Sequence, residues 1–241
     1  MAQTSVASGL DETAYRLVAG NRVLRYIPEA ELRVLVRRSR ILTMEAREPV
    51  FEQGDEGTTV LVVLGGYLKL SSTTQGGREA ILDIAGPGSV FGELAVLNGW
   101  PRAAGAVALS PARLLSIDGA AFTQALVRTP EALLAMVRLV SDRLKTASEQ
   151  MTDAVDLPAT TRVAKALVYL AALHSRMEDG GLRIEFQLSQ RELGGLTGLT
   201  RESINKHLAT FRDSGWLRMS GQDIVLTNLA ALRQDLDARE L

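Results

Sequence analysis

The sequence predicts an α+β protein in which an antiparallel β-roll is followed by one long helix and a small helical domain with a hairpin. Short apolar runs separated by glycine turns occupy residues 50–117, a pattern typical of an antiparallel sandwich or roll. A heptad repeat of apolar residues begins after Thr129, and two capped helices followed by two short strands occupy residues 189–226. The length of 241 residues indicates about two domains.

Composition excludes several kinds of chemistry. The chain has no cysteine, which excludes disulfides, thiolate nucleophiles and iron–sulfur clusters, and its two histidines leave little for a metal or haem site. Lysine and arginine number 27 and aspartate and glutamate 28, so the net charge is −1. The first ten residues lack the pattern of a signal peptide, and the sequence has no apolar run of about 18 residues, the length that spans a membrane. We therefore expect a soluble, cytosolic protein without a metal.

The N-terminal part, residues 1–128, is predicted to form the β-roll. Residues 30–39 have the pattern of a helix that is charged on one face. The apolar runs that follow predict strands, which end at glycine or proline turns. These predicted strands cover residues 60–64, 67–70, 80–84 and 113–117.

Residues 129–157 are predicted to form one long helix and a hinge. Thr129 is a typical N-cap, Pro130 suits the first helical position, and Pro158 closes the helix. Apolar residues then recur at alternating spacings of four and three. They are Leu133, Val137, Val140, Leu144, Ala147 and Met151. One interpretation is an amphipathic helix packed on its own domain, but the strict spacing favours pairing with a second copy, so we expect a homodimer through residues 129–155.

Residues 158–241 have the order of a winged helix-turn-helix. A helix over 162–173 and a short strand over 184–188 are predicted first. A Ser189–Glu192 capping box then opens a helix that ends near residue 196. Gly198 provides a tight turn, Thr200 caps a second helix to about residue 213, and two short strands follow.

The second of these helices carries Arg201, Glu202 and Lys206 near its start. Arginine offers two donors to guanine O6 and N7, and glutamate accepts from cytosine N4, so these residues suit base reading in a DNA major groove. The alternative is an ordinary solvated helix face. His207 in the same helix is expected to contact a phosphate or a neighbouring helix.

Residues 91–104 carry a second informative pattern. The free N–H groups after Gly92, together with Arg102, can hold a phosphate, while the Glu93 carboxylate suits a nearby sugar hydroxyl. A cyclic nucleotide presents both groups. The alternative is a structural Glu93–Arg102 ion pair, and spacing does not separate these two interpretations.

The stretch F-G-E-L-A…P-R-A-A closely resembles the phosphate-binding cassette of cyclic-nucleotide-binding domains. Together with the heptad helix and the winged helix-turn-helix, residues 30–230 resemble the cyclic AMP receptor protein (CRP/FNR) superfamily of bacterial transcription regulators. The resemblance implies that Glu93 takes the ribose hydroxyl and Arg102 the cyclic phosphate. It also implies double-stranded DNA and RNA polymerase as partners, and Arg201, Glu202 and Lys206 as readers of a TGTGA-like half-site.

Further ligand and DNA contacts are expected beside these residues. In the cassette they are Gly92, Leu94 and Ala103, and at the starts of the two helices they are Ser189, Gln190 and Thr200. Bacterial cyclic AMP receptors often have serine where this chain has Ala103, and cyclic GMP binders often have threonine, so Ala103 favours adenine. The base contacts expected on the long helix are Thr146 and Ser148, although the pair that corresponds to the family's Thr-Ser is Ala147-Ser148.

The sequence therefore predicts a regulator that responds to cyclic AMP. A response to cyclic GMP or to both nucleotides, or a ligand-independent regulator with a degenerate site, stays open. A kinase-inhibiting or channel-gating role would need an inhibitor segment or membrane spans. No Ser/His/Asp set, metal cluster or P-loop supports an enzyme, so no catalytic residue is assigned.

Overall fold

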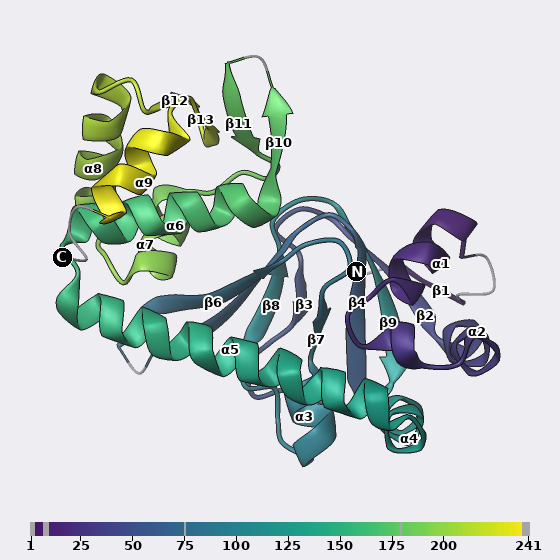
Figure 1. Ribbon diagram of the computed structural model, residues 1–241. Helices are drawn as coiled ribbons and strands as arrows, with labels where there is room; N and C mark the ends of the chain where they lie inside the picture. Colours follow the sequence, from purple (N-terminus) through teal and green to yellow (C-terminus); the bar gives the residue numbers. More distant parts are fainter. Residues whose placement is uncertain (1–2, 7–9, 75, 179, 238–241) are drawn as a thin grey trace. The chain divides into compact units, whose positions relative to one another are not determined.

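The computed structural model describes residues 3–6, 10–74, 76–178 and 180–237 (Figure 1). These residues form two compact units. The first takes its residues from Met1–Thr73 and Leu82–Thr146, and the second from Thr74–Ile81 and Ala147–Leu241. The finer division into 1–128, 129–157 and 158–241 stays a prediction.

Antiparallel sheets form the first unit, which confirms the predicted roll. One sheet has the strand order β1-β2-β9-β4-β7, and the other has the order β3-β8-β5-β6. The strands of the first sheet are β1 (Gln3–Val6), β2 (Arg40–Met44), β9 (Ala112–Asp118), β4 (Thr59–Gly65) and β7 (Val90–Phe91). Those of the second are β3 (Pro49–Phe51), β8 (Gly105–Ala108), β5 (Leu68–Thr73) and β6 (Glu79–Ala85).

The apolar run in β4 is continuous because both faces of this strand are covered. Val60 and Val62 face one buried cluster, and Leu61 and Val63 face the other, as the two-residue period of a strand requires. The second cluster lies among strands and includes Phe91.

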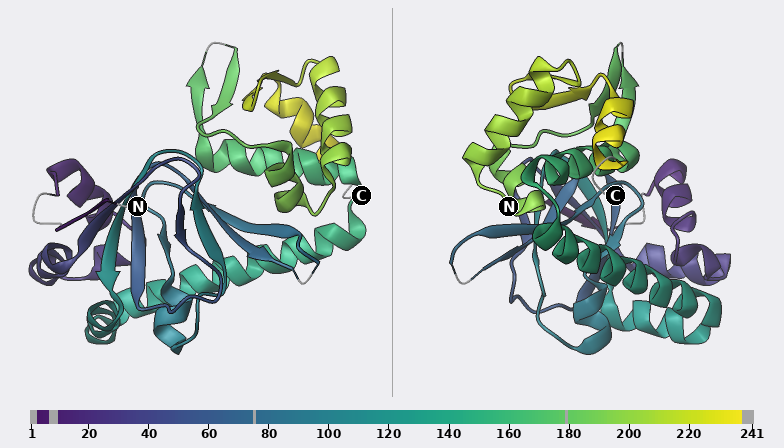
Figure 2. Two further views of the ribbon diagram at one scale, coloured as in Figure 1. Left: turned by 180° about the vertical axis from the view of Figure 1, so that it is seen from behind. Right: turned by 60° about the vertical axis from the view of Figure 1, so that its left-hand side comes forward.

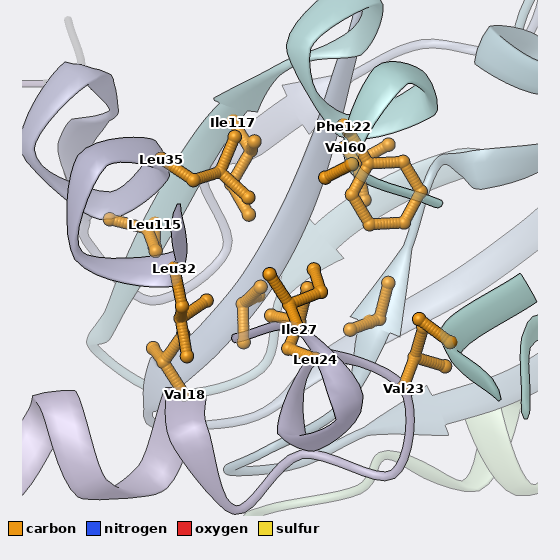
Figure 3. Close-up of a cluster of buried hydrophobic side chains, with 14 of the residues drawn as sticks. Val18, Val23, Leu24, Ile27, Leu32, Leu35, Val60, Leu115, Ile117 and Phe122 are labelled. Atoms are coloured by element: carbon orange, nitrogen blue, oxygen red, sulfur yellow. The ribbon is translucent and has the colours of Figure 1, made fainter. Parts of the chain in front are cut away.

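Helices cover the other face of β4 and β9, as Figure 3 shows for the cluster around Val60 and Phe122. They are α1 (Glu12–Ala19), the 3₁₀ turn η2 (Leu24–Tyr26), α2 (Glu29–Arg38), α4 (Gly119–Arg128) and the first part of α5 (Pro130–Asp156). The short helix α3 (Glu93–Asn98) lies at one end of the roll in each view of Figures 1 and 2. The helix predicted over 30–39 corresponds to α2.

The long helix α5 begins at Pro130, as predicted. Ala132, Ala135 and Met136 on its first turns are buried in the core of the first unit. Val137 and Met151, which belong to the predicted heptad seam, are 54% and 73% exposed. One face of the helix therefore packs on the first unit, and a different face of the same helix carries exposed apolar side chains.

The second unit is the predicted winged helix-turn-helix. Its helices are α6 (Ala159–His174), α7 (Gln190–Thr197), α8 (Arg201–Asp213) and α9 (Leu229–Asp237). Its sheet has the order β10-β11-β13-β12, from β10 (Ser175–Glu178), β11 (Gly181–Ile184), β12 (Leu217–Ser220) and β13 (Asp223–Leu226). Figures 1 and 2 show the β10–β11 hairpin extending away from α6.

The prediction of a strand over residues 184–188 is wrong except at its first residue. β11 ends at Ile184, and the following residues join no strand. Phe186 and Leu188 are buried while Glu185 and Gln187 are exposed. The alternation therefore reports alternate burial along a bent segment that belongs to no strand.

In the part of the chain that the structure describes, no helix has both the length and the apolar character that crossing a membrane requires.

Candidate ligand-binding and DNA-binding sites

Gly92 joins β7 to α3 in a conformation that requires glycine. Its φ is +82°, in the left-handed region that side chains disfavour. A Cβ there would lie 2.3 Å from Nη1 of Arg102 and 3.2 Å from the carbonyl oxygen of Thr59. The glycine therefore lets the Arg102 guanidinium lie directly against the start of α3.

Arg102 is buried, with 5% of its surface exposed. Its Nη1 donates to the carbonyl of Gly92 at 2.9 Å, and its Nη2 donates to the carbonyl and hydroxyl oxygens of Thr59 at 2.8 and 3.0 Å. The guanidinium carbon lies 4.3 Å from the centre of the Phe51 ring. Burial lowers the pKa of Arg102, and the charges of Asp55 and Glu93 act in the opposite direction.

The three bonds use three of the five N–H groups of this guanidinium, so two are left for another partner, and one of them is on Nε. The buried Nε of Arg102 has no hydrogen-bond partner among the described residues. A buried cationic donor without a partner is unfavourable, so this atom is suited to an anionic ligand.

Glu93 is the first residue of α3 and is 1% exposed. Its Oε1 pairs with Nη1 of Arg143 on α5 at 2.5 Å, and Nη2 of Arg143 donates to the Val90 carbonyl at 2.6 Å. The buried Oε2 of Glu93 has no partner among the described residues. Neither carboxylate oxygen pairs with Arg102, which contradicts the alternative of a structural Glu93–Arg102 ion pair.

Arg143 was not predicted as a site residue. It lies 50 positions from Glu93 and outside the cassette, so only the fold brings the two together. The heptad pattern predicts that residues 130–156 form a helix. It does not predict that Arg143 on this helix faces the roll.

The free atoms of the two predicted ligand residues have complementary chemistry. Arg102 offers a cationic N–H, and Glu93 offers an anionic acceptor. A phosphate matches the first and a hydroxyl matches the second, so these residues fit a cyclic nucleotide. Leu94 and Ala103 beside them are exposed.

Thr146 and Ser148 lie near the middle of α5. Thr146 is half-buried and is the last residue of the first unit, whereas Ser148 is exposed and belongs to the second. Their contact with a ligand base stays a prediction.

The two predicted helix starts in the second unit are confirmed. Ser189 caps α7 through the complete capping box with Glu192, and the Thr200 hydroxyl accepts the Ser203 N–H at 3.3 Å at the start of α8. The αL residue Gly198 (φ +69°) ends α7 between them. This is the turn that the sequence predicted.

Arg201, Glu202 and Lys206 are exposed on α8, while Ile204 and Leu208 of the same helix are buried. The backbone N–H of Glu202 and the Thr200 hydroxyl lower the pKa of the Glu202 carboxyl, which keeps it an acceptor. The structure thus leaves the three predicted base readers accessible on the solvent side of α8.

Neighbouring residues hold this helix in place. Oε1 of Gln190 accepts a hydrogen bond from Nε of Arg201 at 3.4 Å. Nδ1 of His207 lies 3.1 Å from the Thr160 hydroxyl on α6. Burial, and then the charge of Lys206, lowers the pKa of His207. His207 therefore contacts a neighbouring helix, one of its two expected roles.

Comparisons with known proteins identify a known domain family in each part of the chain. Residues 41–129 match the family described as "Cyclic nucleotide-binding domain", and residues 161–235 match the "Crp-like helix-turn-helix domain". The chain is 32% identical over 179 residues to the CRP-like cAMP-activated global transcriptional regulator of Mycobacterium tuberculosis, covering 74% of this chain and 80% of that protein. It is 31% identical over 189 residues to the cyclic AMP receptor protein of Thermus thermophilus, covering 78% and 84%.

A solved structure shows the same fold. The structure of FixK2 from Bradyrhizobium japonicum aligns with a TM-score of 0.72 at 21% identity, over 81% of this chain and 96% of that one.

A cyclic-nucleotide-binding roll, a long helix and a Crp-like helix-turn-helix define a ligand-binding transcription regulator. The chain belongs to the CRP/FNR family of such regulators. Relatives such as the M. tuberculosis protein are named as transcriptional regulators and not as enzymes, as the sequence predicted.

Proposed function

We propose that this chain is a homodimer that binds a pseudo-palindromic, TGTGA-like DNA site when cyclic AMP occupies the site at Glu93 and Arg102. The observation that carries the proposal is a pair of buried atoms, Oε2 of Glu93 and Nε of Arg102, that have no partner in the described part of the chain. The nucleotide would supply the missing hydrogen-bond partner of each atom. Its ribose hydroxyl would donate to Oε2 of Glu93, and its phosphate would accept from Nε of Arg102.

The preference for cyclic AMP rests on Ala103 and on the relatives. Ala103 lacks the hydroxyl with which threonine meets the guanine amine, and the relatives from M. tuberculosis and T. thermophilus are named for cyclic AMP. Thr146 and Ser148 of α5 are the proposed contacts to the base. Cyclic GMP, or both nucleotides, is the alternative that a side-by-side titration decides.

The dimer is proposed to form through residues 129–155. Val137 and Met151 of the heptad seam are exposed, and apolar side chains at this spacing are buried when two helices pair. Pairing also places two copies of α8 on one DNA molecule, which matches a pseudo-palindromic site.

Arg201, Glu202 and Lys206 are the proposed base readers. Ser189 and Thr200 at the helix starts are further proposed DNA contacts, and Gln190 belongs to the same site through its hydrogen bond to Arg201. The Ser189 hydroxyl already serves the capping box, so its proposed DNA contact is limited to its remaining acceptor capacity. RNA polymerase is the proposed protein partner, and the cytoplasm, where bacterial DNA lies, is the proposed location.

Calorimetric titration with cyclic AMP and cyclic GMP tests the ligand assignment. We expect the wild-type chain to bind, and Arg102→Leu to bind about 100-fold or more weakly, since two charge-assisted hydrogen bonds are worth about 3–6 kcal/mol. Arg138→Leu, which removes an arginine from the exposed surface of α5, is the matched control. Equal binding by Arg102→Leu and wild type would contradict the assignment.

A further inference from the structure

Gln190 connects the starts of the two DNA-reading helices. It is the first residue of α7, and its Oε1 accepts from Nε of Arg201, the first residue of α8. Gln190 is half-buried, whereas Arg201 is exposed. The amide side chain therefore has the more fixed position and the guanidinium the freer one.

The capping box restricts where Gln190 can lie. Ser189 and Glu192, on either side of it, exchange backbone and side-chain hydrogen bonds of 2.8–3.2 Å. Glu192 is also 3% exposed, so the first turn of α7 is anchored in the unit. Gln190 thus projects from a rigid backbone toward Arg201.

The bond to Nε has a specific consequence for Arg201. It engages the N–H on the side of the guanidinium and leaves the two terminal nitrogens for another partner. Those two nitrogens form the fork that matches guanine O6 and N7. A neutral amide holds this fork in one plane and leaves its charge intact. A carboxylate at the same place would cancel that charge.

We propose that Gln190 is a positioning residue that orients Arg201 for one base of the half-site. The inference rests on the proposed DNA-binding function and deepens it. Gln190 then acts through Arg201 and sets base preference, instead of adding general affinity by touching a phosphate.

Positioning of Arg201 and contact with a phosphate predict different results. Loss of a phosphate contact weakens binding to all sequences alike, whereas loss of orientation affects mainly the base that Arg201 reads. Arg191→Ala supplies a comparison, because it removes an exposed cation from the same helix start and so lowers the dependence of binding on salt.

The experiment uses the full-length chain with cyclic AMP and with cyclic GMP. Wild-type protein first selects its site from duplexes with randomised positions, and affinities are then measured for duplexes that differ from this site by one base pair. Arg201→Ala identifies the base pair that Arg201 reads. At that position we expect Gln190→Ala to reduce discrimination about 3- to 10-fold, a part of what a bidentate contact provides.

Two further results are expected. Gln190→Ala leaves affinity for non-specific duplex and the salt dependence unchanged, and it has no effect on discrimination when Arg201→Ala is already present. Gln190→Glu, which retains an acceptor but adds a negative charge, restores discrimination relative to Gln190→Ala while it lowers the affinity for every duplex.

A uniform loss of affinity in Gln190→Ala, or an equal loss of discrimination in the Arg201→Ala background, would overturn the inference alone. A wild-type chain that selects no sequence with either nucleotide would instead overturn the proposed function, and this inference with it.

Discussion

Replacing Gly92 by alanine tests whether the close approach of Arg102 to the cassette turn shapes the ligand site. Alanine at φ +82° costs about 1–2 kcal/mol for the left-handed conformation alone. Its Cβ would also lie 2.3 Å from Nη1 of Arg102, so the guanidinium must move by about 1 Å to reach an ordinary contact distance.

That movement disrupts the hydrogen bonds of Arg102 to Gly92 and Thr59. Loss of one of these three charge-assisted bonds costs roughly 1.5–3 kcal/mol, so we expect Gly92→Ala to lower the free energy of unfolding by about 2.5–5 kcal/mol in total. Misplacing one charge-assisted bond to the phosphate weakens nucleotide binding by about 10- to 150-fold.

Gly99→Ala is the matched control. Gly99 ends the same helix α3 with φ +66°, and a Cβ there meets nothing within 4 Å. We expect only the conformational cost of about 1–2 kcal/mol and unchanged nucleotide affinity. Denaturant unfolding and calorimetric titration measure both quantities. Equal nucleotide affinity in the two variants would refute the reasoning.

Three further predictions concern the other elements. Val137→Asp on the α5 seam should convert the dimer to monomer in sedimentation equilibrium. Val127→Asp, at a 70% exposed site on α4, should not. A Val137→Asp dimer as stable as the wild-type dimer would contradict pairing through this seam. Because the folded state lowers the pKa of His207, the unfolded chain takes up a proton first as pH falls through about 6.5, so stability should drop there. His207→Gln should flatten this part of the unfolding profile, and an unchanged slope would exclude His207 as its source. Ser189→Ala should cost about 1 kcal/mol of unfolding free energy and Ser189→Thr much less; equal losses would show that the cap hydroxyl is not the cause.

Features that depend on neighbouring residues could be predicted from the sequence. The capping box at Ser189 and the turn at Gly198 were correct because a side chain and a backbone three or four positions away determine them. The start of α5 at Pro130 was correct for the same reason.

Features that depend on the fold could not be predicted in this way. The Glu93–Arg143 pair joins the cassette to α5, and no local spacing indicates it. β10 was missed because its sequence, Ser-Arg-Met-Glu, has no apolar alternation. The segment after Ile184 was assigned to a strand because alternate burial gives the same apolar pattern in a segment that joins no strand.

Operator affinity measured as a function of nucleotide concentration tests the central claim most directly. The account predicts that cyclic AMP raises the affinity of the wild-type chain for its selected duplex, by about 5- to 150-fold as is typical of coupled sites, and that Arg102→Leu removes this increase. Full affinity of the wild-type chain without any nucleotide, unchanged on adding cyclic AMP or cyclic GMP, would contradict it.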